Sequence, residues 1–216
     1  MKKTDLVVYG AGGMGREVMW LIESNPAYNE KYNILGYVDD LERLQGASVN
    51  NRPVVGDTSW LLAYQKEIAV AIAVGSSVAR KNIFEKISCN KNIIFPNFIA
   101  DNVIVSEYVK IGKGCIICSN CVLTVNIEIG DFLLSNLNCI ITHDSKIGDF
   151  VTLNPSVNIS GNVNLGDCTN IGTGTKIIQS KTVGKGTIIG AGAVVVRDIP
   201  ANCTAVGVPA KPIKFH

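Results

Sequence analysis

The sequence lacks long apolar runs and any concentration of charge of one sign. No stretch approaches the roughly 18 uninterrupted apolar residues of a membrane-spanning helix, and the run Leu6–Tyr9 near the start is too short for a signal peptide. The formal net charge is +2 over 216 residues, without a long basic run, so no nucleic-acid or membrane surface is expected. These absences favour a cytoplasmic protein with a small-molecule partner.

Histidine is nearly absent, and cysteine occurs in an odd number. Seven cysteines in a chain without an export signal indicate free thiols rather than disulfides. The spacing of Cys115, Cys118 and Cys121 invites a metal site, but Cys115 and Cys121 fall on inward positions of the repeat described below, where free cysteine packs well. We therefore expect core cysteines and no metal. Since the other histidine, His216, is the last residue, His143 is the one credible histidine base.

A repeat of six residues dominates the second half of the chain. The residue four places after each repeat position is again mostly small or β-branched, so each hexad has two inward positions. Neither the apolar spacing of an amphipathic helix nor the hairpins of an antiparallel sheet fits this pattern. The repeat positions, all aliphatic except Ser135, are Ile99, Val105, Ile111, Ile117, Leu123, Ile129, Ser135, Ile141, Ile147, Leu153, Ile159, Leu165, Ile171, Ile177, Val183, Ile189 and Val195.

Glycine marks a second period of eighteen residues within this repeat. Three hexads would then form one triangular coil, with short strands that meet at tight corners where glycine supplies conformations closed to other residues. Successive coils would stack at about the 4.8 Å spacing of paired strands. The glycines that mark the period are Gly112, Gly130, Gly148, Gly166 and Gly184.

The repeat resembles the hexapeptide-repeat acyltransferases over residues 99–200, and the segments 189–200 and 206–212 resemble that family's closing coil and tail. The resemblance implies that residues 96–216 form a single-stranded left-handed parallel β-helix with a C-terminal tail, an exception to right-handed crossover. It also implies acetyl-CoA as the cosubstrate. In the family such β-helices form homotrimers, with each active site between neighbouring chains.

Residues 1–95 have a different pattern, in which strands and helices alternate. This alternation predicts a small Rossmann-like α/β domain, with a parallel sheet and helices on its faces. The expected elements are strands at 6–9, 34–38 and 69–74 and helices at 14–24 and 78–87.

A glycine-rich turn, Gly10–Gly15, lies between the first strand and the first helix, where backbone N–H groups attract phosphate. Asp39 and Asp40 end the second strand, where an acid can hold a ribose or a base edge. Fewer than 100 residues supply only about half of a full dinucleotide fold, so one nucleotide is a more economical ligand than NAD. The alternative is that the glycines only make a tight turn.

Three segments of this half, Tyr9–Gly15, Tyr37–Asp40 and Ala71–Gly75, resemble the N-terminal domain of enzymes that acetylate sugars for bacterial glycans and sialic acids. That family includes the nucleotide 4-amino-sugar N-acetyltransferases of the bacillosamine and perosamine pathways. The bacillosamine enzyme has histidine where this chain has Met14. The resemblance implies contacts to a UDP or GDP sugar at Gly12, Gly13, Met14, Asp39, Asp40 and Gly75.

His143 is third in its hexad, outside the inward positions and near a corner. A solvated corner histidine is one interpretation. The alternative interpretation, a catalytic histidine, depends on Gly161, which lies eighteen residues further on. A glycine there would leave room for a ligand and expose its backbone N–H. A neutral imidazole and such an N–H could act as base and oxyanion donor in acetyl transfer.

The family's motif is a histidine followed by an acid, with an asparagine about seven residues earlier, which corresponds to His143, Asp144 and Asn136. The resemblance implies that His143 is the general base, that Asp144 raises its basicity, and that Asn136, beside the polar Ser135, positions the substrate. The bacillosamine enzyme has a histidine in place of Thr152. Implied acetyl-CoA contacts are Gly161, Thr152, Thr173 and Thr182.

The sequence therefore predicts an acetyl-CoA-dependent acetyltransferase that acts on the 4-amino group of a nucleotide-activated amino sugar in bacterial glycan biosynthesis. Residues 1–95 would bind the nucleotide sugar, and residues 96–216 would carry acetyl transfer. An O-acetyltransferase acting on sialic acid or another sugar is the nearest alternative. A non-catalytic nucleotide-sugar-binding protein is a third, because a β-helix can be purely structural.

Overall fold

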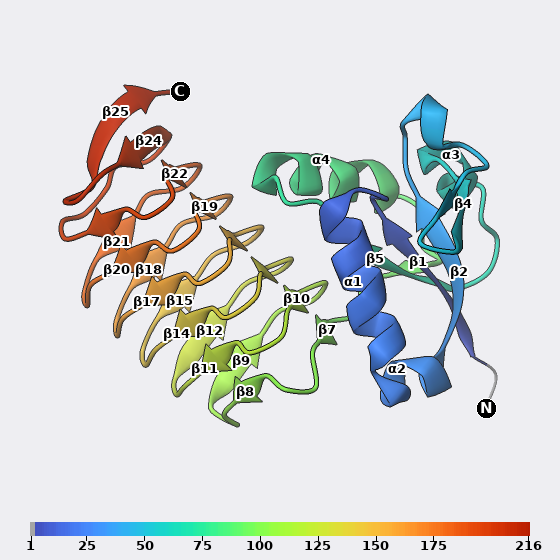
Figure 1. The fold of residues 1–216 in the computed structure, drawn as a ribbon, viewed down its shortest axis with the longest axis horizontal. Helices are drawn as coiled ribbons and strands as arrows, with labels where there is room; N and C mark the ends of the chain where they lie inside the picture. Colours follow the sequence, from blue (N-terminus) through green and yellow to red (C-terminus); the bar gives the residue numbers. More distant parts are fainter. Residues whose placement is uncertain (1–2) are drawn as a thin grey trace. The chain divides into compact units, whose positions relative to one another are not determined.

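The computed structural model describes residues 3–216, and the chain divides into two compact units. The first unit comprises Met1–Gly75 and Ala79–Phe98, and the second comprises Ser76–Val78 and Ile99–His216. The first is an α/β unit, and the second is built from short stacked strands (Figure 1). Each is described separately below.

The α/β unit has a six-stranded sheet in the order β3-β4-β2-β1-β5-β6. Its strands are parallel except for the β3–β4 pair, and β1 lies between β2 and β5. The expected parallel sheet is confirmed, and β3, β4, β6, α2 and α3 are additions that the sequence pattern did not predict. The elements are β1 (Thr4–Tyr9), α1 (Gly13–Ser24), α2 (Pro26–Lys31), β2 (Tyr32–Val38), a 3₁₀ helix η1 (Glu42–Leu44), β3 (Ser48–Val49), β4 (Arg52–Gly56), α3 (Thr58–Leu62), β5 (Ile68–Ile72), α4 (Ser77–Ile87) and β6 (Ile93–Ile94).

The central strands of this sheet are buried, and the helices begin at recognisable caps. β5 is buried along its whole length, as expected for a central parallel strand with both faces covered. The Asn25 side chain accepts a hydrogen bond from the Ala27 N–H at the start of α2, and Asp57 does the same for Trp60 at the start of α3. By contrast, α1 begins at Gly13, and its N-cap residue, Gly12, has no side chain that could accept a hydrogen bond from the first turn.

The second unit is a left-handed parallel β-helix, as predicted. Each of the predicted repeat positions is the last residue of a strand, and the same strand recurs every third element because the coil has eighteen residues. The strands are β7 (Phe98–Ile99), β8 (Ile104–Val105), β9 (Val109–Ile111), β10 (Ile116–Ile117), β11 (Val122–Leu123), β12 (Ile127–Ile129), β13 (Leu134–Ser135), β14 (Ile140–Ile141), β15 (Lys146–Ile147), β16 (Thr152–Leu153), β17 (Asn158–Ile159), β18 (Asn164–Leu165), β19 (Asn170–Ile171), β20 (Lys176–Ile177), β21 (Thr182–Val183), β22 (Ile188–Ile189), β23 (Val194–Val195), β24 (Cys203–Val206) and β25 (Lys211–Phe215).

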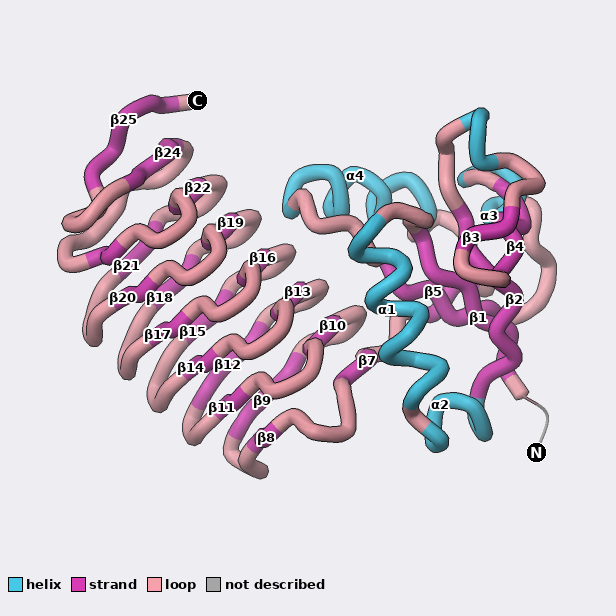
Figure 2. The backbone as a smooth tube through the Cα atoms, viewed as in Figure 1, coloured by secondary structure: helices cyan, strands magenta, loops and turns pink. Residues whose placement is uncertain are grey.

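The stacked coils create three sheets, one on each side of the triangular section (Figure 2). The eight-stranded sheet runs from β7 to β25, the six-stranded sheet from β8 to β23, and the five-stranded sheet from β9 to β21. The inward side chains form one continuous apolar column, to which Cys115, Cys121 and Cys139 belong. Val105 is an exception, being 42% exposed in the first coil, because no further coil lies beneath it.

The expectation that the periodic glycines supply left-handed corners is wrong. Left-handed backbone occurs instead at every sixth residue of another series, which includes Asn126, Asp144 and Asn162. The periodic glycines are needed for close stacking: a Cβ on Gly130 would lie 2.9 Å from the carbonyl carbon of Gly148 in the next coil. Adjacent coils therefore approach more closely there than a side chain allows.

Candidate active site

His143 and Asp144 lie in the turn between β14 and β15, where the six-stranded and five-stranded sheets meet. The Nδ1 atom of His143 is 2.8 Å from Oδ2 of Asp144, and their side chains are 60% and 54% exposed. A carboxylate can only accept, so Nδ1 carries the proton and Nε2 of the neutral ring keeps its lone pair. The hydrogen bond from His143, followed by one from Asn126, holds the pKa of Asp144 below its ordinary value. The pair thus leaves Nε2 as the basic nitrogen of a largely exposed side chain.

Gly161 lies against the imidazole ring from the next coil. A Cβ on Gly161 would be 2.5 Å from Nε2 of His143 and closer still to Cε1. The room that was expected here for a ligand is therefore occupied by the histidine ring. Within residues 3–216 no acceptor pairs with the N–H of Gly161, although Gly161 itself is buried against the imidazole.

Asn136 lies at a different corner of the coil from His143. It follows β13, whereas His143 follows β14, so one whole strand of the six-stranded sheet separates the two turns. Its Oδ1 accepts a hydrogen bond from the Leu137 N–H at 2.7 Å. The neighbouring Ser135 is buried, and its hydroxyl lies 3.5 Å from the thiol of Cys121. Within one chain, the structure thus brings His143, Asp144 and Gly161 together but not Asn136.

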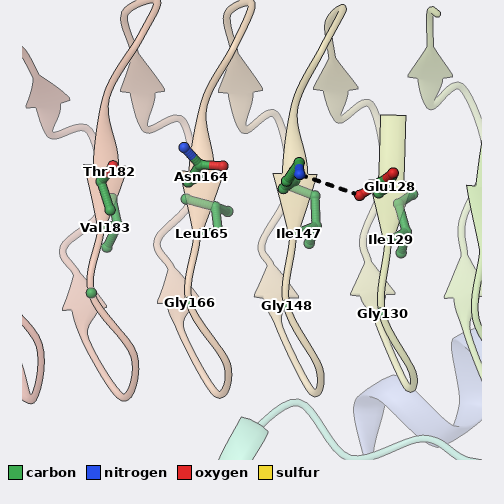
Figure 3. A pocket seen from close by; sticks show the side chains of 12 residues that line it. Glu128, Ile129, Gly130, Ile147, Gly148, Asn164, Leu165, Gly166, Thr182 and Val183 are labelled. Atoms are coloured by element: carbon green, nitrogen blue, oxygen red, sulfur yellow. Dashed lines mark ion pairs between the residues drawn. The ribbon is translucent and has the colours of Figure 1, made fainter. Parts of the chain in front are cut away.

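The four predicted cofactor contacts are distributed over different sides of the β-helix. Thr182, in β21, lines a shallow hollow on the five-stranded sheet, together with the Lys146–Glu128 ion pair (Figure 3). Thr152, in β16, is buried on the eight-stranded sheet, and Thr173 lies in the turn between β19 and β20. The turn that holds Gly161 adjoins the five-stranded sheet, to which Thr182 belongs, and the six-stranded sheet, which begins after the turn of Thr173.

In the α/β unit, the predicted nucleotide contacts gather at one edge of the sheet. Because β1 pairs in parallel with both β2 and β5, the segments after these three strands emerge side by side. They carry the glycine-rich turn, the two acids and Gly75. Arg80, almost fully buried, donates hydrogen bonds to the carbonyls of Val74 at 2.7 Å and Gly75 at 3.4 Å. This edge is where a doubly wound fold binds ligands.

Asp39 is already bonded within the chain. Its Oδ2 accepts the N–H of Ala11 at 2.8 Å, and its Oδ1 accepts the N–H of Leu41 at 2.9 Å. A carboxylate offers about four acceptor positions, so two of them remain for a ligand. Asp39 thus also fixes the glycine-rich turn.

Asp40 holds together the ends of two elements. Its Oδ2 accepts the Tyr9 hydroxyl at 2.8 Å, while its Oδ1 accepts the N–H and hydroxyl of Thr58 at 2.9 and 2.7 Å. Partial burial raises the pKa of Asp40, but these hydrogen bonds outweigh it and lower the pKa overall. Burial, reinforced by Asp40, raises the pKa of Tyr9 well above its ordinary value. Neither Tyr9 nor Thr58 was predicted from the sequence, although Tyr9 stands directly before the glycine-rich turn.

Comparisons with known proteins agree with both units. The PglD N-terminal domain family matches residues 5–87. A comparison with curated protein sequences gives no significant match. Among solved structures, the acetyltransferase domain of PglB from Neisseria gonorrhoeae is 34% identical, with a TM-score of 0.87 over 98% of this chain and 100% of that one. The chain belongs to the PglB-type acetyltransferases.

Two further structures extend this similarity. WeeI from Acinetobacter baumannii is 32% identical to this acetyltransferase, with a TM-score of 0.88 over 98% of this chain and 100% of the other. PerB from Caulobacter crescentus, in complex with CoA and GDP-perosamine, is 27% identical, with a TM-score of 0.87 over 97% of each chain. The likeness therefore extends along both units of the acetyltransferase.

The described part of the acetyltransferase offers neither a metal centre nor a membrane span. Across residues 3–216, no cluster of three or more histidine, cysteine or acidic side chains is arranged to hold a metal ion. No helix in the same range has the length and apolar character needed to cross a membrane. The three cysteines that suggested a metal site, Cys115, Cys118 and Cys121, are buried free thiols.

Proposed function

We propose that this protein transfers the acetyl group of acetyl-CoA to the 4-amino group of a nucleotide-activated amino sugar in bacterial glycan biosynthesis. The observation that carries the proposal is the arrangement of His143, Asp144 and Gly161, in which an imidazole oriented by a carboxylate lies beside a backbone N–H that has no acceptor within residues 3–216. The related PglB structure contains acetyl coenzyme A, and the PerB structure contains CoA and GDP-perosamine.

In the proposed reaction, Nε2 of His143 accepts a proton from the sugar amine as the nitrogen attacks the thioester carbonyl carbon. The N–H of Gly161 donates to the oxyanion that develops on the carbonyl oxygen. The carbon–sulfur bond then breaks, and the imidazolium returns its proton to the departing CoA thiolate. Asp144 stabilises the imidazolium between these two proton transfers and keeps the ring in the productive orientation.

We propose that residues 1–95 bind the nucleotide sugar through the sheet edge that carries Gly12, Gly13 and Met14. The uncapped start of α1 offers N–H groups for a phosphate. The remaining acceptor positions of Asp39 could take donors from the ribose or the base, and Gly75 lies at the same edge. Asp40, in contrast, serves mainly to fix this edge because three donors already occupy it.

We propose that residues 96–216 act as a homotrimer. His143 and Asn136 lie at different corners of one chain, so a site that contains both would need the His143 corner of one chain and the Asn136 corner of its neighbour. Such a groove between chains would also let Gly161, Thr173, Thr152 and Thr182 contribute to acetyl-CoA binding from different sides of the β-helix. Sedimentation or light scattering should give three times the chain mass of 23.1 kDa.

The free thiols support a place in a reducing compartment. Within residues 3–216, the five buried cysteines of the β-helix form no disulfide, which is usual for cytoplasmic proteins. We therefore propose a cytoplasmic location, which localisation of a tagged copy in fractionated cells would test. The core cysteines are Cys115, Cys118, Cys121, Cys139 and Cys203.

The test of function is the release of CoA thiol from acetyl-CoA in the presence of UDP-, GDP- and dTDP-linked 4-amino sugars and of sialic acid. Wild type is compared with His143→Ala and with His216→Ala, which removes the other histidine. We expect turnover of one amino sugar, lost in the first variant and retained in the second. Turnover of sialic acid alone would move the acceptor to oxygen. An active His143→Ala, or no release with any acceptor, would contradict the proposed chemistry.

A further inference from the structure

Asp144 is held from two sides. Its Oδ2 faces Nδ1 of His143 at 2.8 Å, and its Oδ1 accepts a hydrogen bond from Nδ2 of Asn126 at 3.2 Å. Asn126 lies at the same corner one coil earlier, and both residues have left-handed backbone, with φ of 55° for Asn126 and 62° for Asp144. One carboxylate therefore bridges an asparagine below it and the imidazole beside it.

Hydrogen bonds of this kind between residues stacked at the same corner of successive coils recur along the β-helix. In each case the side-chain N–H₂ of an asparagine donates to the side-chain oxygen of the residue eighteen positions later. Among residues 3–216, however, Asp144 is the only such acceptor that also takes a hydrogen bond from another side chain. The other three pairs are Asn102 with Asn120 at 2.9 Å, Asn138 with Ser156 at 3.3 Å, and Asn162 with Ser180 at 3.1 Å.

We infer that Asn126 is a positioning residue for acetyl transfer, acting on His143 through Asp144. This inference rests on the proposed function. The Asp144 side chain is exposed, so without a second partner its carboxylate can rotate away from the ring. The hydrogen bond from Asn126 occupies Oδ1 and thereby directs Oδ2 toward Nδ1. The ring is then kept with its proton on Nδ1 and its free lone pair on Nε2.

The test uses glycine substitutions, because glycine adopts the left-handed backbone without steric cost and so deletes only the side chain. The variants are Asn126→Gly, Asp144→Gly and the double variant, with Asn120→Gly as the matched control. Asn120 is left-handed and takes part in the same kind of stacked hydrogen bond, but it lies at another corner. Each is assayed for acetyl transfer with the accepted sugar, and its unfolding temperature is recorded.

We expect Asn126→Gly to lower kcat/KM by about three- to tenfold, the effect of one exposed hydrogen bond. Asn120→Gly should retain wild-type kcat/KM with a similar change in unfolding temperature. The double variant should be no less active than Asp144→Gly alone, because Asn126 has nothing left to position. Additive losses, or an Asn126→Gly variant as active as wild type, would overturn the inference.

A second measurement does not depend on turnover. In a His216→Gln background His143 is the only histidine, so ¹⁵N shifts of its ring report which nitrogen carries the proton. The share of the form protonated on Nδ1 should fall in Asn126→Gly and in Asp144→Gly but not in Asn120→Gly. An unchanged ring in Asn126→Gly would count against the inference. A fully active His143→Ala would instead refute the proposed function itself.

Discussion

Replacing Gly161 by alanine should inactivate the enzyme while leaving it folded. The backbone at Gly161 is not left-handed, so alanine can adopt it, and the three atoms nearest to the new Cβ all belong to the His143 ring. The ring is largely exposed and can turn into solvent. The substitution should therefore remove only the hydrogen bond between His143 and Asp144, which lowers the free energy of unfolding by about 0.5–1 kcal/mol at an exposed site. Alanine also raises the free energy of unfolding by about 0.4–1 kcal/mol, because it has less conformational entropy than glycine in the unfolded chain.

The loss of activity should be far larger than the loss of stability. General base catalysis contributes about 10²- to 10⁴-fold, and a displacement of about 1 Å at the reacting groups can cost 10²-fold. We therefore expect kcat/KM of Gly161→Ala to fall at least about 100-fold, while the unfolding temperature changes by no more than about 4 °C. Alanine keeps the N–H at this position, so the oxyanion donor itself is retained.

The assay compares CoA release by Gly161→Ala, His143→Ala and the double variant. If the effect acts through the imidazole, the double variant should be no slower than His143→Ala, because the ring that the new methyl group displaces is already gone. A Gly161→Ala enzyme within about threefold of wild type would refute the reasoning. So would a further loss in the double variant, which would assign the effect to a different contact.

Three further predictions concern stability. Tyr9→Phe should lower the free energy of unfolding by about 1–3 kcal/mol in a urea titration, because it removes the hydroxyl that donates to Asp40. Folding lowers the pKa of Asp40 below 3.8, so the ionised carboxylate stabilises the fold fully above that pH, and this stabilisation is lost as the pH falls through the folded pKa. Wild type should therefore lose more stability on acidification than Asp40→Asn. Gly130→Ala should cost about 1–3 kcal/mol, because its Cβ meets the backbone of the next coil, and an unchanged urea midpoint would contradict that interpretation.

The sequence predicted the β-helix well because two positions per hexad point inward and their apolar side chains recur without a break in register. The first coil shows the limit of the rule: Val105 fits the repeat but is exposed, since burial depends on a neighbouring coil that the pattern does not count. The role of the periodic glycines was misassigned for a related reason. Their spacing identifies a place where coils approach each other, but spacing alone does not distinguish a close contact from a left-handed turn.

A signal for the left-handed corners was nevertheless present. Asparagine and aspartate tolerate left-handed backbone better than other residues with side chains, and they recur at multiples of six at Asn120, Asn126, Asn138, Asp144 and Asn162. Phe132 and Phe150 adopt the same backbone and stack with ring centroids 4.9 Å apart. No local preference predicts phenylalanine there, so those corners required the structure.

In the α/β unit, the sequence placed the acids correctly but could not show what already bonds to them. The position of Asp39 and Asp40 after a central strand follows from the pattern, whereas their partners Ala11, Thr58 and Tyr9 come from other segments. Two neighbouring acids that look equivalent in the sequence thus differ in the number of acceptor positions left for a ligand, since Asp39 accepts two hydrogen bonds and Asp40 accepts three. A ligand that needs a carboxylate at this edge should depend more on Asp39.

The coil period links residues at the candidate site that are far apart in the chain. One step of eighteen residues along the sequence from His143 leads to Gly161, and the imidazole ring does rest on that glycine. The same step back from Asp144 leads to Asn126, a contact that was not predicted from the sequence. Because stacked coils place equivalent residues in contact, a catalytic turn in a β-helix is shaped as much by the turns above and below as by its own neighbours. A variant at Asn126 should therefore alter catalysis without touching the substrate.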